Sequence, residues 1–126
     1  MNFRIAVFMM LFGLVAACQA EPEGWSRVAA PELTQEISSK ETSLTVVDVR
    51  EPELFQAGHI PGAINMPYPA AKKDILTALK PDQNIVFVCH GGPMGAELAA
   101  ILAAKGYPNV RNLQGGMRSW SGALEQ

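Results

Sequence analysis

Two uninterrupted runs of apolar residues constrain the fold of this chain more than any other feature. They are SLTVVDV (43–49) and NIVFVC (84–89), and both are rich in valine. Continuous runs of β-branched residues are typical of parallel strands buried on both faces, because a strand with one wet face alternates polar and apolar residues. The sequence therefore predicts an α/β fold built on a parallel sheet.

The segments around these runs have the periodicity and punctuation of helices and short strands. We expect helices over 30–40, 70–80 and 95–106, helical turns from Pro52 to Gly58 and after Gly116, and short strands at 27–29, 63–65 and 109–113. Alternating strands and helices predict one small domain, with a mainly parallel sheet and helices on both faces. Ligands of such sheets bind beyond the carboxyl ends of the strands, so Cys89 and the segment after Asp48 can share one crevice.

Cys89 ends the second run, and HGGPMG follows it before a predicted helix. The nucleophilic form of cysteine is the thiolate, and helix N-termini or cations lower the thiol pKa from about 8.5 to roughly 3.5–7.5. Backbone N–H groups of a glycine-rich loop before a helix can also bind an anion. We name residues 89–95 the cysteine loop and predict a reactive thiol there; the alternative is an inert cysteine that ends a buried strand. The candidate substrate-binding residues are His90, Gly91, Gly92, Pro93, Met94 and Gly95.

Residues 1–20 have the layout of an export signal. Arg4 precedes an apolar run from Ile5 to Ala17, which is short for a membrane span. We therefore predict a signal peptide over 1–20, a folded domain over 21–126, and a location in the periplasm of a Gram-negative bacterium. LVAAC resembles the lipobox of bacterial lipoproteins, so cleavage before a lipidated Cys18 and anchoring in the outer membrane are expected; ordinary cleavage after Ala20 is the alternative.

Three motifs occur in order along the predicted domain: VVDVREPELFQAGHIPGAINMPY, IVFVC and GYPNVRNLQGGMRSW. Together they resemble the rhodanese family, and are most similar to its single-domain exported bacterial members. The resemblance implies a rhodanese-like domain in which Cys89 takes sulfane sulfur from thiosulfate or another donor, holds it as a persulfide and passes it to cyanide or another thiophilic acceptor. It implies no metal and no organic cofactor. Asp48 and Arg50 match the family's supporting acid and base, which organise the crevice.

The cysteine loop departs from the family pattern in its charge. Family loops commonly carry arginine or lysine, whereas HGGPMG has neither, and Met94 stands about where an arginine is often found. Charge-assisted hydrogen bonds are about twice as strong as neutral ones, so we expect weak thiosulfate binding or a different donor. A phosphatase-like loop would need an arginine at Gly95.

Two functions without turnover stay open: a persulfide carrier that serves a protein thiol partner, and a redox sensor. Nucleic acid is excluded as a partner by the near balance of 10 basic and 12 acidic residues.

Overall fold

The computed structural model describes residues 22–40 and 43–126. The predicted signal peptide over 1–20 and the predicted lipidation of Cys18 lie outside the described residues. Within the described part of the chain, no helix is both long and apolar enough to cross a membrane.

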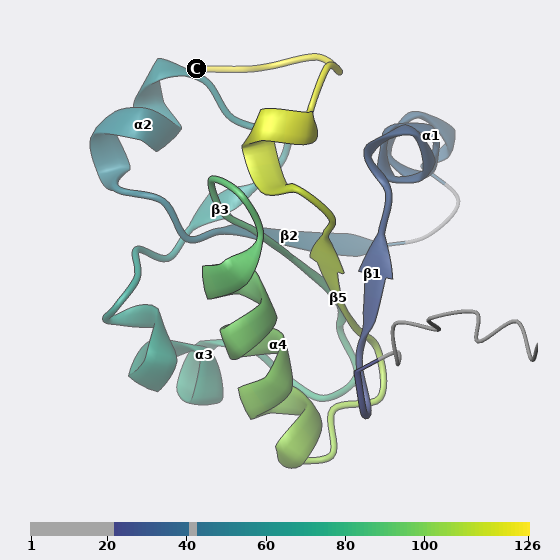
Figure 1. The fold of residues 1–126 in the computed structure, drawn as a ribbon, viewed down its shortest axis with the longest axis vertical. Coiled ribbons are helices and arrows are strands. Elements are labelled where there is room, and N and C mark those ends of the chain that lie inside the picture. Colours follow the sequence, from purple (N-terminus) through teal and green to yellow (C-terminus); the bar gives the residue numbers. More distant parts are fainter. Residues whose placement is uncertain (1–21, 41–42) are drawn as a thin grey trace, which may run out of the picture.

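Five parallel strands form one sheet in the order β1-β5-β4-β2-β3 (Figure 1). The strands are β1 (Ser26–Val28), β2 (Leu44–Asp48), β3 (Ile64–Asn65), β4 (Asn84–Val88) and β5 (Val110–Leu113). The two apolar runs thus become the neighbouring inner strands β2 and β4, with Asp48 opposite Val88. This confirms the predicted parallel sheet and places Asp48 and Cys89 at the same edge of it.

Helices cover both faces of the sheet, as predicted. They are α1 (Ala30–Ser39), α2 (Pro52–Ala57), α3 (Ala71–Ala78), α4 (Pro93–Ala104) and the 3-10 helix η1 (Gly116–Ser119). Ile75 of α3 and Leu98 of α4 pack with Phe87 on one face, while Leu33 of α1 packs with Val86 on the other. Successive residues of β4 therefore supply the two cores in turn, which explains why its apolar run has no polar alternation.

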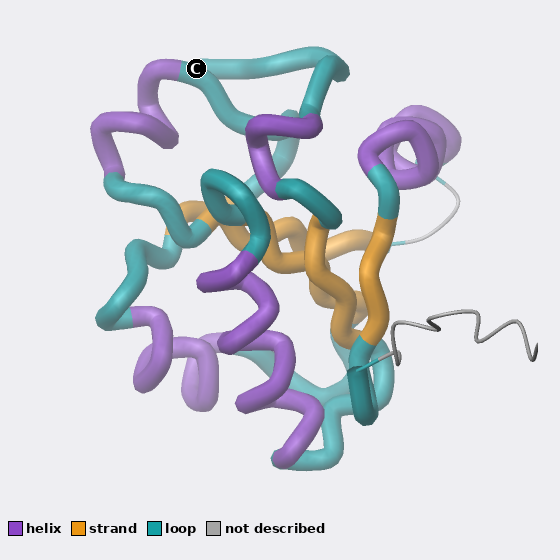
Figure 2. The backbone as a smooth tube through the Cα atoms, viewed as in Figure 1, coloured by secondary structure: helices purple, strands orange, loops and turns teal. Residues whose placement is uncertain are grey.

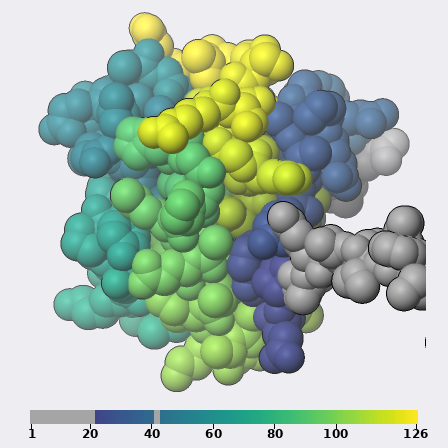
Figure 3. Space-filling view, viewed as in Figure 1, coloured from purple at the N-terminus to yellow at the C-terminus, as the bar shows by residue number. Residues whose placement is uncertain are grey.

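The loops that follow β4 and β5 lie side by side beyond the carboxyl ends of the strands (Figure 2). Two backbone hydrogen bonds join them: the Met117 N–H donates to the Cys89 carbonyl at 2.8 Å, and the Arg118 N–H donates to the His90 carbonyl at 3.0 Å. In the space-filling view, the yellow C-terminal residues lie against the green residues at the start of α4 (Figure 3). The closing segment of the chain is therefore part of the wall around the cysteine loop.

Two local details differ from the sequence predictions. The helix expected from residue 95 begins at Pro93, because proline suits the first turn, where its missing N–H would have no helical partner. The closing helix is a short 3-10 turn, entered through the left-handed Gly115.

Candidate active site

Cys89 follows β4 directly and is almost fully buried, with 1% of its surface exposed. The Gly92 N–H donates a hydrogen bond to its Sγ at 3.0 Å. This contact places a backbone donor directly against the sulfur atom. The thiol therefore points toward the cysteine loop and is held there by a backbone N–H.

The conformation of the cysteine loop depends on Gly92 and on Asn112 of β5. Gly92 has φ +119, a backbone angle that residues with a side chain rarely adopt. The Asn112 Nδ2 donates to the Gly92 carbonyl at 3.0 Å, while its buried Oδ1 has no hydrogen-bond partner among the described residues. A polar side chain in a core strand thus holds Gly92, the residue whose N–H contacts the sulfur. The sequence reasoning missed it, although an asparagine within a buried strand was the available signal.

A cavity of about 420 Å³ opens onto the thiol. Its lining residues are Cys89, His90, Gly91, Pro93, Met94 and Arg118. The structure therefore brings together four of the six candidate substrate-binding residues. Gly92 does not line the cavity, but its N–H donates to the Cys89 sulfur. Gly95 is not part of the cavity. It is buried within α4, where an added Cβ would lie 2.0 Å from the Asn112 Oδ1.

Arg118 is the cavity residue that the sequence reasoning missed. A Cβ added to Gly91 would lie 3.5 Å from the Arg118 Nη1, so the guanidinium reaches the cysteine loop from η1. Gly116 makes this approach possible, because a Cβ there would lie 2.4 Å from the Cys89 carbonyl oxygen. The sequence signal was the glycine pair before Met117 and Arg118, which marks a close backbone approach without showing what is approached.

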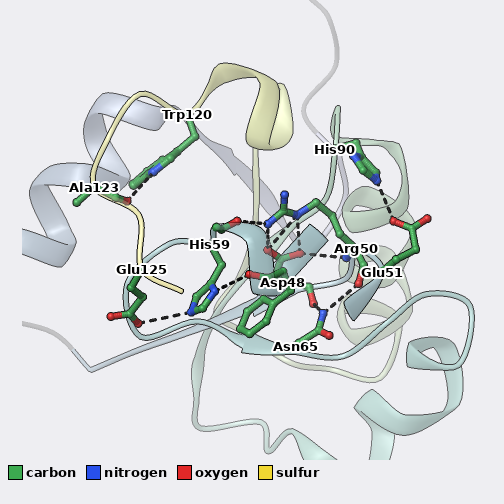
Figure 4. A network of polar contacts seen from close by, with 11 residues as sticks. Asp48, Arg50, Glu51, His59, Asn65, His90, Trp120, Ala123 and Glu125 are labelled. Atoms are coloured by element: carbon green, nitrogen blue, oxygen red, sulfur yellow. Dashed lines mark hydrogen bonds and ion pairs between the residues drawn. The ribbon is translucent and has the colours of Figure 1, made fainter. Parts of the chain in front are cut away.

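Asp48 and Arg50 form a buried ion pair (Figure 4), and neither residue lines the cavity. The Arg50 Nη2 donates to the Asp48 Oδ2 at 2.8 Å and to the Gly58 carbonyl at 2.8 Å, and the Arg50 backbone N–H donates to the Asp48 Oδ1 at 3.0 Å. The Asn65 Nδ2 donates to the Asp48 and Arg50 carbonyls. This network orders the chain between β2 and α2, which borders the site.

His90 connects that segment to the cysteine loop. Its Nε2 lies 3.1 Å from the Glu51 Oε2, and Figure 4 shows the two side chains facing one another. The pKa of the exposed Glu51 carboxyl is lowered, first by a hydrogen bond from its own backbone and then by His90. His59 lies elsewhere: its ring stacks on Phe55 at 3.7 Å and its Nδ1 lies 2.8 Å from the Phe55 carbonyl. His59 therefore has a packing position, away from the thiol.

Together these groups can present a sulfur nucleophile to a small anion. The thiol receives a backbone hydrogen bond, the start of α4 leaves N–H groups without helical partners, and a guanidinium borders the same cavity. Among the described residues, no cluster of histidine, cysteine, aspartate or glutamate could hold a metal ion.

Comparison with known proteins identifies the family. The family model described as "Rhodanese-like domain" matches residues 29–123. The chain is 34% identical over 91 residues to the "Putative sulfur carrier protein YrkF" of Bacillus subtilis, covering 72% of this chain and 48% of that protein, and thus about half of its length. It is 34% identical over 110 residues to the human "Thiosulfate:glutathione sulfurtransferase", covering 77% of this chain and 94% of that protein.

The fold also matches a solved structure of a rhodanese-like domain. The crystal structure of a rhodanese-like domain protein from Staphylococcus aureus matches with a TM-score of 0.70 and 29% identity, covering 79% of this chain and 95% of that one. Fold, family model and relatives all support sulfurtransferase chemistry in general. This chain belongs to the rhodanese family.

Proposed function

We propose that this protein moves sulfane sulfur from thiosulfate or another donor to a thiophilic acceptor through a persulfide on Cys89. The observation that carries the proposal is the Cys89 Sγ itself, which borders a cavity of about 420 Å³ and accepts a hydrogen bond from the Gly92 N–H at 3.0 Å. The same N–H is in place to donate a hydrogen bond to the sulfur during the transfer. The named activity of the human relative supports this chemistry.

The reaction needs no oxidant or reductant beyond its two substrates. The Cys89 thiolate attacks the sulfane sulfur of thiosulfate, a new S–S bond forms, and the bond to the sulfonate breaks with its electron pair leaving as sulfite. Cyanide then attacks the outer sulfur of the Cys89 persulfide. A C–S bond forms, the S–S bond breaks, and its electron pair returns to Cys89 as the thiolate. Covalent catalysis of this kind divides one difficult transfer into two easier ones.

Thiocyanate formation from thiosulfate and cyanide tests the proposal, with Cys89→Ser as the matched variant. We expect turnover in the wild type and only the uncatalysed background in Cys89→Ser, since a hydroxyl at this position is a far weaker nucleophile. Far-UV circular dichroism of both proteins controls for folding. Equal rates in the two proteins would exclude Cys89 as the sulfur acceptor.

A persulfide carrier is the second candidate, favoured by the name of the Bacillus subtilis relative. A carrier would also form the Cys89 persulfide but would release it to a protein thiol rather than to cyanide. Intact-mass measurement after treatment with thiosulfate detects the added sulfur atom. A persulfide that persists with excess cyanide and disappears with a reduced protein thiol would favour the carrier over the enzyme.

We also propose export to the periplasm with a lipid anchor at Cys18. The support is the layout of residues 1–20, with an apolar run that ends in LVAAC. A lone domain cysteine is also more exposed to oxidation in such a compartment, which favours a thiol that is in use. Mass spectrometry of the mature N-terminus tests this: acylated Cys18 is expected, whereas a free N-terminus at Glu21 would exclude the anchor.

A further inference from the structure

The cavity beside Cys89 is bordered by Arg118, which no carboxylate of the described residues neutralises. Arg50 is paired with Asp48 and Arg111 with Glu36, but within residues 22–40 and 43–126 the Arg118 side chain has no hydrogen-bond or ion-pair partner. Its five N–H donors are therefore available to a ligand. An unpaired guanidinium at the mouth of a cavity that ends on a nucleophilic sulfur is suited to an anionic substrate.

The position of Arg118 is fixed relative to the thiol by its own backbone. Its N–H donates to the His90 carbonyl at 3.0 Å, and the preceding Met117 N–H donates to the Cys89 carbonyl at 2.8 Å. Gly116 allows this contact because its missing Cβ would overlap the Cys89 carbonyl. The guanidinium is thus attached to the two peptides that carry the nucleophile and its neighbour, and only its side-chain torsions remain free.

Arg118 supplies the positive charge that the cysteine loop lacks. The loop offers backbone N–H groups on one side of the cavity, while Arg118 borders the cavity from η1, and its Nη1 lies 3.5 Å from the position a Gly91 Cβ would take. Pro93 and Met94 form an apolar part of the lining. Arg118 itself is exposed, so its guanidinium is hydrated until a ligand binds, and the charge-assisted hydrogen bonds that it can donate are about twice as strong as neutral ones.

We propose that Arg118 binds the anionic end of the sulfur donor, such as the sulfonate of thiosulfate, and thereby selects anionic donors over neutral ones. This rests on the proposed function, because the donor is the substrate of the same cavity. It replaces the expectation of weak thiosulfate binding, which followed from the absence of a cation in HGGPMG. The cation is present, but it is supplied by the closing segment of the fold.

Binding without chemistry is the first test. In a Cys89→Ser background, thiosulfate is titrated against Arg118→Gln, Arg118→Lys and the control Lys105→Gln, and Kd is measured from NMR chemical shifts. Lys105→Gln removes the same charge from an exposed position at the far end of α4. We expect Arg118→Gln to weaken binding about tenfold, Arg118→Lys to retain most of it, and the control to change little. Equal Kd values for Arg118→Gln and Lys105→Gln would overturn the proposal, as would a failure of thiosulfate to saturate the Cys89→Ser protein.

Alkylation of Cys89 is the second test, and it does not require any sulfur transfer. Iodoacetate is an anion and iodoacetamide is its neutral analogue. The rate with iodoacetate divided by the rate with iodoacetamide therefore reports the charge that the cavity presents to an incoming reagent. We expect Arg118→Gln to lower this ratio several-fold relative to Lys105→Gln. An unchanged ratio would contradict the role of Arg118 even if thiocyanate formation depends on Cys89. A lowered ratio in a protein that forms no thiocyanate would support the anion site while refuting the proposed function.

Discussion

Replacing Gly116 by alanine tests whether the closing segment is held directly on the nucleophile's peptide. Gly116 has φ +58, and its Cβ would lie 2.4 Å from the Cys89 carbonyl oxygen and 2.7 Å from the Gly91 nitrogen. These neighbours are backbone atoms, which cannot rotate away as a flexible side chain can. Gly62→Ala is the matched control, because Gly62 has φ +80 with nothing within 4 Å of its Cβ position.

The two variants share one source of strain and differ in the other. A left-handed backbone costs a residue with a Cβ about 1–2 kcal/mol, and this is the whole effect expected for Gly62→Ala. At Gly116 the separation of 2.4 Å must also grow by about 1 Å to reach an ordinary contact. That movement breaks or stretches the hydrogen bonds from Met117 and Arg118, each contributing about 0.5–1.5 kcal/mol. We therefore expect Gly116→Ala to lower the free energy of unfolding by about 2–5 kcal/mol.

Urea unfolding measures both losses, and steady-state kinetics with thiosulfate measures the effect on the site. Because Arg118 moves with Gly116, kcat/KM should fall for Gly116→Ala, up to about 100-fold for a displacement near 1 Å, while Gly62→Ala should retain wild-type values. Equal losses of stability in the two variants would refute the close approach of η1. A destabilised Gly116→Ala with unchanged kcat/KM would refute the dependence of the site on η1.

Three further predictions concern the ion pairs and the cavity wall. Asp48→Ala strands the buried Arg50 guanidinium and should lower the free energy of unfolding by about 3–5 kcal/mol in urea; a loss below about 1 kcal/mol would mean that the pair is not buried in solution. The Arg111 hydrogen bond lowers the pKa of Glu36, so this carboxylate contributes stability above its ordinary pKa and loses it as the pH falls through the lowered value. Thermal melts should then show less acid destabilisation for Glu36→Gln than for wild type, and parallel curves would contradict the pairing. Met94→Arg adds a second cation to the cavity lining, so the KM for thiosulfate should fall; a KM that rises or stays constant would show that the donor does not approach this wall.

The fold could be predicted where local pattern and tertiary packing agree. The runs that became β2 and β4 are buried on both faces, so their composition alone indicated central parallel strands. The sequence pattern was a weaker guide to the burial of single residues. The helix expected over 70–80 spans Ala71–Ala78, and it buries Ala71 and Ile75 fully while leaving Leu76 40% exposed.

The site was predictable to the extent that it is local in sequence. Cys89, its glycines and the following helix are contiguous, so strand-end chemistry and helix-terminus physics were enough to place them together. Arg118 and Asn112 reach the same loop through tertiary contacts, from η1 and β5. No periodicity or spacing rule connects those positions to Cys89, and an arginine after a glycine pair is as compatible with a solvated turn as with a ligand contact.

Placing the nucleophile and the cation on different segments separates two properties that a conventional loop would combine. The Gly92 N–H that bonds the thiol is fixed by Asn112, and neither group has a hydrogen bond to the Arg118 side chain. A substitution at Arg118 can therefore change which donor binds while the thiol keeps its backbone contact. The charge-free sequence HGGPMG is thus compatible with an anionic donor, and it moves the choice of donor to the closing turn of the chain.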